Sequence, residues 1–175
     1  MPAYVQSLID EGKLGRKSGI GLYKMEKHDN GIRKLTVYDI ATNQYRELFQ
    51  YRFPFAEEMK LFISEGDYED AFKVLVNNHS QEAELCLAFL LRYIIYSLYA
   101  AEELGDSIEA ADDVMATGFN WCPPLAMYQA LSNVVDVRVL THERIPEITD
   151  MVDVDRLFNK VQSSKYDYRV YFRSK

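Results

Sequence analysis

The chain has 175 residues, of which 48% are hydrophobic and 13% aromatic, so it can bury a core as one domain or as two small ones. Its 20 basic and 27 acidic residues give a formal charge of −7, which disfavours a general nucleic-acid or anionic-membrane surface, because phosphate binding relies on clustered Lys and Arg. Cys86 and Cys122 lack a paired spacing, so we expect reduced thiols and no zinc site or disulfide.

The N-terminal residues lack the charged and apolar regions of a signal peptide, and we expect a cytoplasmic protein. The most apolar run, 85–101, is nearly long enough to span a bilayer, but it contains Arg92 near its centre. We therefore expect a buried core helix and no membrane partner.

The first part of the chain predicts a short helix followed by a small sheet. Residues 4–11 place Val5, Leu8 and Ile9 on one helical face, and Gly12 and Gly15 end that helix. Glycines at 15, 19 and 21 permit positive φ and close chain contacts. Three segments then alternate as strands of a meander would, with turns at Asn30-Gly31 and Thr42-Asn43: 20–26, 34–40 and 44–49.

The second part predicts helices. Phe53-Pro54-Phe55 reads as a linker, and helices at 55–63 and 68–76 follow, with Asp67 as an N-cap candidate. Ser80 can cap a long helix over 81–104, which is apolar almost all round and should therefore be the central member of a bundle.

The remaining elements are shorter. Ser107 can cap a helix over 108–117 with Ala110, Ala111, Val114 and Met115 inward, and Gly118 is its predicted C-cap. Helical segments at 126–131, 134–140 and 154–161 follow, and 166–173 alternates like a strand. The sequence thus predicts a mainly α protein, a helical bundle with a small β-hairpin or meander near the N-terminus.

The run Gly15-Arg16-Lys17-Ser18-Gly19-Ile20-Gly21-Leu22-Tyr23 resembles the signature that closes the helical C-terminal domain of 3-hydroxyacyl-CoA dehydrogenases. The long helix, the Ser107 helix and Gly118-Phe119-Asn120-Trp121 with Pro124 also resemble the core of that domain. The residues at 120 and 123 depart from a pattern in which glycine is usual. The resemblance implies a bundle of the 6-phosphogluconate/3-hydroxyacyl-CoA dehydrogenase C-terminal type.

The position of the signature, close to the first residue, implies a piece of a larger enzyme that lacks the NAD-binding domain. Longer family members carry the helical domain twice. The resemblance therefore implies that 3–25 is the tail of a first copy, 26–54 a β-hairpin connector, 55–142 a second copy and 143–175 a C-terminal extension. The spacing of Val5, Leu8 and Leu22 recurs at Val154, Leu157 and Tyr171, and chance similarity of two helix-turn-strand units is the alternative explanation.

The intact enzyme, by this resemblance, would oxidise (S)-3-hydroxyacyl-CoA to 3-oxoacyl-CoA with NAD in fatty-acid β-oxidation. Family catalysis uses a His–Glu pair on the missing domain and an Asn at the start of the first copy's long helix, and no Asn occurs at 84–87. We expect this chain to be inactive alone, to help shape the acyl-CoA cleft, to pack against the first helical copy and to be able to form a homodimer. A free-standing interaction or acyl-CoA-binding module is the alternative. An independent hydrolase using Cys122 or a histidine has no residue spacing to recommend it.

We predict no catalytic, cofactor-binding or metal-binding residue in the chain itself, since NAD would be bound by the missing domain. The basic cluster at Lys13, Arg16 and Lys17, extended by Lys24 and Lys27, could meet coenzyme A phosphates. A solvated turn that packs the end of the first copy against its neighbour is the simpler interpretation.

Histidines, Arg92, Trp121 and Cys122 are the other residues whose side chains could have a functional role. His28, His79 and His142 are expected to be surface histidines, because no carboxylate partner can be placed from the sequence. An internal ion pair of Arg92 with Asp112 or Asp113 is favoured over ligand contact. Trp121 is expected to anchor the core, and Cys122, without an activating base, to be structural.

Overall fold

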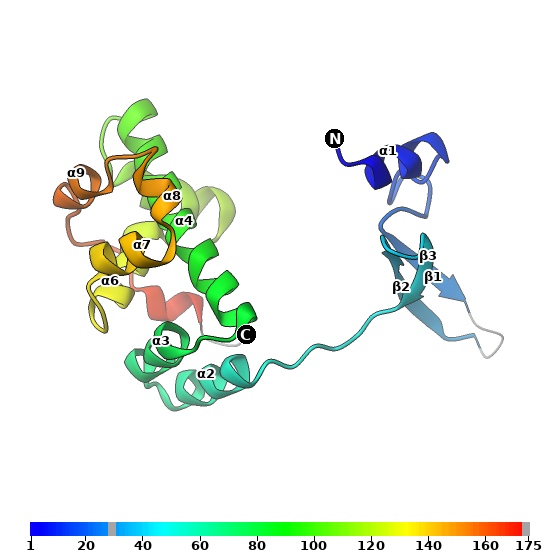
Figure 1. Ribbon diagram of the computed structural model, residues 1–175, viewed down its shortest axis with the longest axis horizontal. Coiled ribbons are helices and arrows are strands. Elements are labelled where there is room, and N and C mark those ends of the chain that lie inside the picture. The colour runs from blue at the N-terminus through cyan, green and yellow to red at the C-terminus, as the bar shows by residue number, and fades with distance from the viewer. Residues whose placement is uncertain (28–30, 173–175) are drawn as a thin grey trace. The chain divides into compact units, whose positions relative to one another are not determined.

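The computed structural model describes residues 1–27 and 31–172, and the chain divides into two compact units, Met1–Tyr51 and Arg52–Lys175. We call them the sheet unit and the helical unit (Figure 1). The predicted fold class, mainly α with a small sheet near the N-terminus, is confirmed. The assignment of the chain to two copies of a family domain stays a prediction.

The sheet unit consists of helix α1 (Ala3–Asp10) and a three-stranded antiparallel meander, β1 (Tyr23–Lys27), β2 (Arg33–Asp39) and β3 (Gln44–Glu47). The register pairs Tyr23 with Val37 and Tyr38 with Tyr45. β1 begins three residues later than predicted because the chain at 20–22 is still part of the glycine-rich loop. Of the predicted turns, 42–43 is present with Asn43 at φ 57°, and Asn30 lies outside the described residues.

The sheet unit has a small core. Leu8, Thr36 and Tyr38 are buried, and the Thr36 hydroxyl donates to the Lys24 carbonyl at 3.1 Å. The Tyr38 hydroxyl donates to the Asn43 side chain at 3.0 Å. A three-stranded sheet needs further packing to be stable, and α1 is the helix that the same unit contains.

The helical unit begins at the predicted linker. Pro54 is the first residue of a helix rather than part of a break, because an N–H at the first helical position would have no partner within the helix and proline has none. Phe55 is buried in the core. The elements in order are α2 (Pro54–Glu65), α3 (Tyr68–Asn77), α4 (Gln81–Leu104), α5 (Ala110–Asp113), the π-helical stretch η1 (Val114–Phe119), α6 (Pro124–Ser132), α7 (Val137–Arg144), α8 (Pro146–Thr149), α9 (Val154–Asn159) and the 3-10 helix η2 (Tyr168–Tyr171).

α4 is the central helix, as predicted, and contacts α3, α5, α6, α7 and α9 (Figure 1). Its bounds match the sequence prediction, and the Ser80 hydroxyl caps it by accepting from the Ala83 N–H at 3.3 Å. Its buried residues form one stripe of the helix: Ala83, Leu87, Leu91, Ile94, Ile95, Ser97, Leu98 and Ala101.

The prediction that α4 is covered on several sides is only partly right. Leu85 and Phe89 are 70% and 67% exposed on the opposite stripe, so hydrophobic composition alone misplaced them.

The stretch after α4 departs most from the prediction. The helix expected over 108–117 is a four-residue α-helix followed by a π-helix. Ala111 is buried as expected, but Val114 is 55% exposed. Gly118 is not the C-cap: the residue with left-handed backbone is Asn120, at φ 52°.

Residues 154–172 are packed within the helical unit. Val154, Leu157 and Phe158 of α9 are part of its core. The strand predicted over 166–173 is wrong in its described part, which forms η2. The rings of Tyr168 and Phe172 lie 6.0 and 5.9 Å from the Phe72 ring, so aromatic packing onto α3 decides the conformation where period-two alternation suggested a strand. In the suggested repeat, α9 corresponds to a helix like α1, but Leu22 precedes a strand whereas Tyr171 ends a 3-10 helix.

Candidate functional site: the glycine-rich loop and its cleft

Residues 13–22, which we call the signature loop, form a tight loop between α1 and β1, and the Ser18 hydroxyl holds it together. The Ser18 hydroxyl accepts from the Leu14 N–H at 2.8 Å and lies 2.8 Å from the Ile20 carbonyl, to which it donates. The Gly15 N–H donates to the same Ile20 carbonyl at 2.8 Å, which closes the base of the loop. The loop is therefore fixed by local hydrogen bonds.

Two glycines of the loop are required for different reasons. Gly15 has φ 81°, in the left-handed region that side chains with a Cβ avoid. Gly21 has an ordinary φ, but a Cβ placed there would lie 2.6 Å from the Gly15 Cα. The Gly21 carbonyl also accepts from the Tyr45 hydroxyl at 2.5 Å. The loop is thus pinned to the sheet at the point where its two arms touch.

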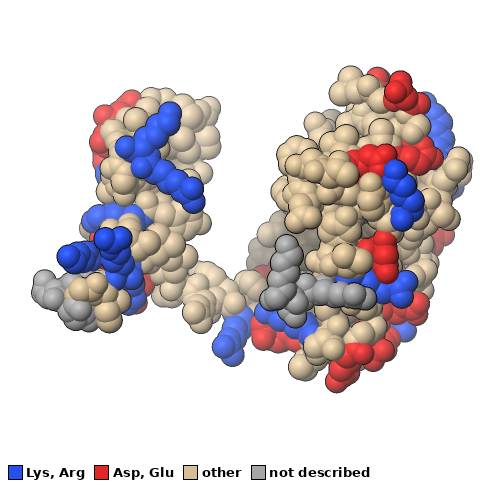
Figure 2. All heavy atoms as spheres, turned by 180° about the vertical axis from the view of Figure 1, so that it is seen from behind, with Lys and Arg blue, Asp and Glu red and all other residues tan. Residues whose placement is uncertain are grey.

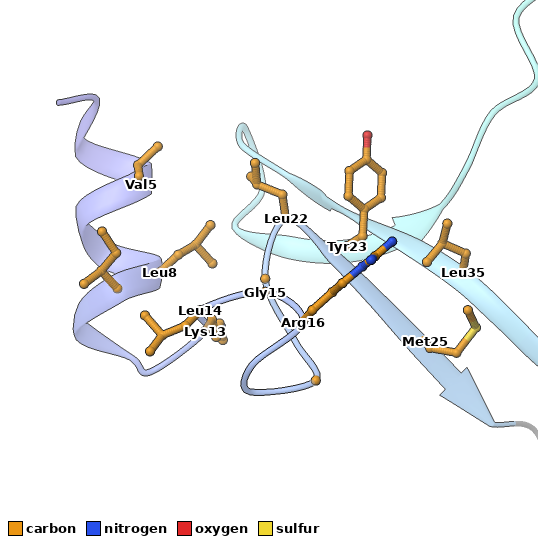
Figure 3. Close-up of a pocket in the computed structure, with 13 residues that line it drawn as sticks. Val5, Leu8, Lys13, Leu14, Gly15, Arg16, Leu22, Tyr23, Met25 and Leu35 are labelled. Carbon is orange, nitrogen blue, oxygen red and sulfur yellow. The ribbon is translucent and has the colours of Figure 1, made fainter. Parts of the chain in front are cut away.

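An open cleft of about 900 Å³ lies between α1, the signature loop and the β1–β2 face of the sheet (Figure 3). Its walls are mostly apolar: Val5, Leu8, Ile9, Leu14, Leu22, Tyr23, Met25 and Leu35. Val5 and Leu8 point from α1 towards Leu22 (Figure 3). Several of these side chains are largely exposed, among them Leu14 at 55% and Tyr23 at 55%. The cleft can therefore bind an apolar group of a ligand, because much of its apolar lining is exposed in the sheet unit.

Two of the predicted basic residues line this cleft, Lys13 and Arg16, and Lys17 does not. Lys13 forms an ion pair with Glu11 at 2.5 Å and lies 5.7 Å from the ring centres of Tyr38 and Tyr45. Its hydrogen bond with Glu11 raises the Lys13 pKa and lowers that of Glu11. The positive charge of Lys13 therefore already has a partner in the Glu11 carboxylate.

Arg16 is the cation best placed for an external anion. Within the parts of the chain that the structure describes, Arg16 makes no ion pair, and its side chain runs from the loop towards the strand that carries Tyr23 (Figure 3). Lys17 is exposed at the tip of the loop. Lys24 pairs with Glu26 at 2.8 Å and faces the Tyr45 ring, away from the cleft lining. Lys27 is exposed at the end of β1 and does not line the cleft. Of the predicted cluster, Arg16 and its neighbour Lys17 are thus the cations at the cleft that are open to a ligand.

Charge is unevenly divided between the two units. The first 51 residues carry eight basic and six acidic side chains, and the remaining residues carry twelve and twenty-one. On the face shown in Figure 2, blue Lys and Arg atoms spread over the sheet unit, whereas red Asp and Glu atoms recur over the helical unit. The sheet unit is the more favourable part of the chain for an anionic ligand.

The histidines that the structure describes lie on the surface, with carboxylate partners that the sequence could not supply. His79 Nδ1 lies 2.9 Å from Glu84, and Arg144 contacts the same carboxylate, so this group ties the start of α4 to the end of α7. His142 Nε2 lies 3.6 Å from Asp155. His28 lies outside the described residues.

Two predictions in the helical unit are wrong. Arg92 is not in an internal pair with Asp112 or Asp113: its side chain is 44% exposed and pairs with Glu147 of α8. Trp121 is not a core anchor, because it is 55% exposed and only leans against Tyr93 and Phe119, with ring centres 6.2 and 6.1 Å away.

Asp112 is a buried carboxylate that sequence reasoning did not single out as a cap. It is 2% exposed, accepts from the Leu125 N–H at 2.7 Å and receives the Ser164 hydroxyl. Burial raises its pKa, against the lowering effect of the Ser164 and Leu125 hydrogen bonds. Pro123 is the N-cap of α6 and Pro124 its first residue, so the helix has no side-chain cap of its own. The signal in the sequence was this uncapped helix start. The burial of Asp112 is therefore explained by its structural role as the acceptor for the Leu125 N–H at the start of α6.

Cys122 lies beside this group. Burial raises the pKa of its thiol to about 12, so the thiol stays protonated at neutral pH and is a poor nucleophile. Among the residues that the structure describes, no group of three or more His, Cys, Asp or Glu side chains could hold a metal ion.

Comparison with known proteins gives one distant similarity. The chain is 26% identical over 134 residues, 75% of its length, to a Bacillus subtilis (strain 168) protein described as "Probable 3-hydroxyacyl-CoA dehydrogenase", and the match covers 16% of that protein. No protein-family model matches the chain. No solved structure matches it. The chain is therefore a mainly helical protein with distant similarity to part of a 3-hydroxyacyl-CoA dehydrogenase.

Proposed function

We propose that the chain is a non-catalytic portion of a 3-hydroxyacyl-CoA dehydrogenase, in which the sheet unit contributes to the acyl-CoA cleft. The intact enzyme would oxidise (S)-3-hydroxyacyl-CoA to 3-oxoacyl-CoA with NAD bound by another domain. The distant similarity to a dehydrogenase over 75% of the chain supports the proposal, as does the glycine-rich signature.

The observation that carries the ligand assignment is the pairing of an apolar cleft with Arg16 on its lining. An acyl-CoA has an apolar acyl chain, a flat adenine and several phosphate charges. The walls formed by residues such as Leu14, Leu22 and Tyr23 suit the apolar parts, and the Arg16 guanidinium can make charge-assisted hydrogen bonds with a phosphate. Lys17 adds positive charge beside it.

The chain's own residues would bind and orient the ester in this scheme. The fixed signature loop keeps Arg16 at the cleft, since Ser18 and the Gly15–Gly21 contact hold the loop's two arms. Hydride transfer belongs to NAD and to residues of the other domain, so the chain alone is expected to show no dehydrogenase activity.

Calorimetric titration of the full chain with acetoacetyl-CoA tests the assignment, with NADH alone as the control ligand. We expect the CoA ester to bind and NADH not to bind. Arg16→Glu should weaken binding by about tenfold or more, since it replaces a favourable charge-assisted bond by repulsion. Arg33→Glu, on an exposed β2 position that does not line the cleft, is the matched control and should leave the affinity unchanged.

Free coenzyme A separates the two halves of the site. If phosphates on Arg16 supply most of the affinity, coenzyme A and its acetoacetyl ester bind alike and both lose affinity in Arg16→Glu. Absence of heat with both would reject the assigned cleft. Binding of NADH that the CoA ester does not displace would contradict the division of labour between this chain and another domain, because NADH shares adenine and a diphosphate with coenzyme A.

A further inference from the structure

A groove in the helical unit lies between the C-terminal half of α4 and the elements that follow it, α5 and η1. It has a volume of about 370 Å³. The α4 residues that line it recur at helical spacing and so occupy one face of the helix: Tyr96, Ser97, Ala100, Ala101 and Leu104. Tyr96 and Leu104 lie about 12 Å apart along the helix axis, so the groove is elongated.

Small side chains make this groove hollow. Ala100 and Ala101 line it from α4, and Ala110 and Ala111 line it from α5. Because these side chains end at Cβ, the two helices can contact each other and still leave space beside the contact. The π-helix η1 places Phe119, which is 61% exposed, at the mouth of the groove. The groove therefore lies beside a π-helical turn, a feature that is frequent at functional sites.

Ser97 brings a buried hydroxyl to the lining of the groove, because the residue is only 9% exposed. A buried hydroxyl within a helix often donates to the carbonyl one turn earlier, as Thr141 does to Val137 at 2.7 Å. In the described part of the chain, the Ser97 hydroxyl makes no hydrogen bond. No fully enclosed side-chain oxygen or nitrogen of those residues lacks a partner, so the Ser97 oxygen opens onto the groove. It lacks a hydrogen bond that a bound molecule can supply.

The lining determines what kind of molecule fits. None of the described residues that line the groove is charged, so a carboxylate, phosphate or ammonium group would lose its water there without gaining a partner. The other hydroxyl of this lining belongs to Tyr96, which is 74% exposed. Apolar walls around one unpaired hydroxyl fit a neutral, apolar molecule with a single hydrogen-bonding group.

Size and shape narrow the class further. At about 370 Å³, the groove is roughly two and a half times as large as the ~150 Å³ cavity that holds benzene, so it suits a ligand of about ten to fifteen non-hydrogen atoms. Its length along α4 favours an extended alkyl chain. The Ser97 hydroxyl lies near one end of that length, and it can both donate and accept. An alcohol is the polar group that can do the same in return.

We propose that this groove, the alanine groove, binds a neutral medium-chain alcohol. The alkyl chain lies along the alanines of α4 and α5, and the alcohol hydroxyl exchanges a hydrogen bond with Ser97. The proposal rests on the helical unit alone and does not depend on acyl-CoA binding by the sheet unit.

Calorimetric titration of the full chain with octan-1-ol tests the proposal, beside two ligands of the same chain length. We expect octan-1-ol to bind with a Kd of about 1 mM or tighter. 1-Fluorooctane should bind at least about fivefold more weakly, because it cannot donate to the Ser97 oxygen. Octanoate should bind at least about tenfold more weakly, because its carboxylate would be desolvated without a cation.

Variants locate the site and the hydrogen bond. Ser97→Ala should reduce the affinity for octan-1-ol to that for 1-fluorooctane, whereas Ser64→Ala should not, since Ser64 lies on α2 and does not line the groove. Ala100→Leu should abolish binding of both ligands by filling the groove. Its matched control is Ala88→Leu, at another half-buried alanine of α4 that does not line the groove, and this variant should bind normally. Circular dichroism confirms that each variant stays folded.

Three results would overturn the proposal. The first is no binding of octan-1-ol up to its solubility limit. The second is equal affinity for octan-1-ol, 1-fluorooctane and octanoate, which would mean that the Ser97 hydroxyl and the absence of charge do not select the ligand. The third is binding that persists in folded Ala100→Leu, which would place the alcohol elsewhere on the chain, such as the cleft of the sheet unit.

Discussion

Gly21 shows how one residue type can be fixed by a close contact rather than by backbone conformation. Its φ is ordinary, so a Ramachandran argument gives it no special role, but the Gly15 backbone occupies the space that a side chain would need. The signature loop is thereby closed against the sheet. The spacing of glycines in the sequence indicated close contacts, and the structure identifies which pair makes one.

We expect Gly21→Ala to destabilise the sheet unit by about 1–3 kcal/mol, because its Cβ would lie 2.6 Å from the Gly15 Cα and the loop arms would have to part. Gly118→Ala is the matched control: nothing lies within 4 Å of a Cβ there and its φ is not positive. Hydrogen exchange of amides in β1 and α1 measures the loss of stability, which should appear as lower protection in Gly21→Ala than in Gly118→Ala. Equal protection in the two variants would contradict this account of Gly21.

Asn120 explains a departure that looked unfavourable in the sequence. The resemblance led us to expect glycine near this position, and the structure gives Asn120 a φ of 52°. Asparagine tolerates this left-handed region better than other residues with a Cβ, so it can replace glycine where the π-helix ends.

Among the elements, α6 depends on a side chain from another helix. Its N-terminus has two prolines and no cap of its own, and the Asp112 carboxylate of α5 accepts the Leu125 N–H while Ser164 binds the other side of the carboxylate. One buried group thus links α5, α6 and the segment before η2.

Asp112→Ala should lower the free energy of unfolding by about 1–3 kcal/mol, since the buried Leu125 N–H loses its acceptor. Asp112→Asn keeps an acceptor and removes the titration. Burial raises the pKa of Asp112, so the folded state holds the proton more tightly than the unfolded state. The contribution of this group to stability is therefore present below the ordinary Asp pKa and is lost as the pH rises through the folded-state pKa.

Chemical denaturation of the wild type and Asp112→Asn across acidic to neutral pH measures this contribution. The free energy of unfolding of the wild type, relative to that of the variant, should be highest at low pH and fall as the pH rises. A difference that grows with pH would mean that the carboxylate, not the acid, is the form that the fold prefers.

At the scale of the whole molecule, two units share one chain but differ in core size. The sheet unit buries few side chains, such as Leu8 and Tyr38, whereas the helical unit has one large cluster around α4. The residues from 48 to 53 between β3 and α2 form no regular element, and 48–52 are exposed.

Brief chymotrypsin treatment of the full chain should therefore cut first after Leu48, Phe49 or Tyr51, which are exposed sites of the kind that the protease prefers. We expect a resistant fragment containing 52–175, because unfolding its core exposes far more apolar surface. Mass spectrometry identifies the first cuts. Early cleavage within α4 or α6 would show that the helical unit is the less stable of the two.

The sequence by itself determined the features that local chemistry controls. The Ser80 cap and the bounds of α4, the meander and the turn at Asn43 followed from hydrogen bonding, side-chain periodicity and backbone preference over a few residues. The resemblance in the signature loop pointed to the dehydrogenase similarity that comparison then found in part.

Tertiary structure alone decided which side of an apolar helix is covered and which charge meets which. Leu85 and Leu87 are the same residue type two positions apart, yet one is 70% and the other 1% exposed, because the helices that contact α4 cover the stripe of Leu87 and leave that of Leu85 open. Arg92 pairs with Glu147, 55 residues further along the chain, for the same reason. Composition cannot predict such outcomes, since they depend on residues brought together by packing rather than by order in the chain.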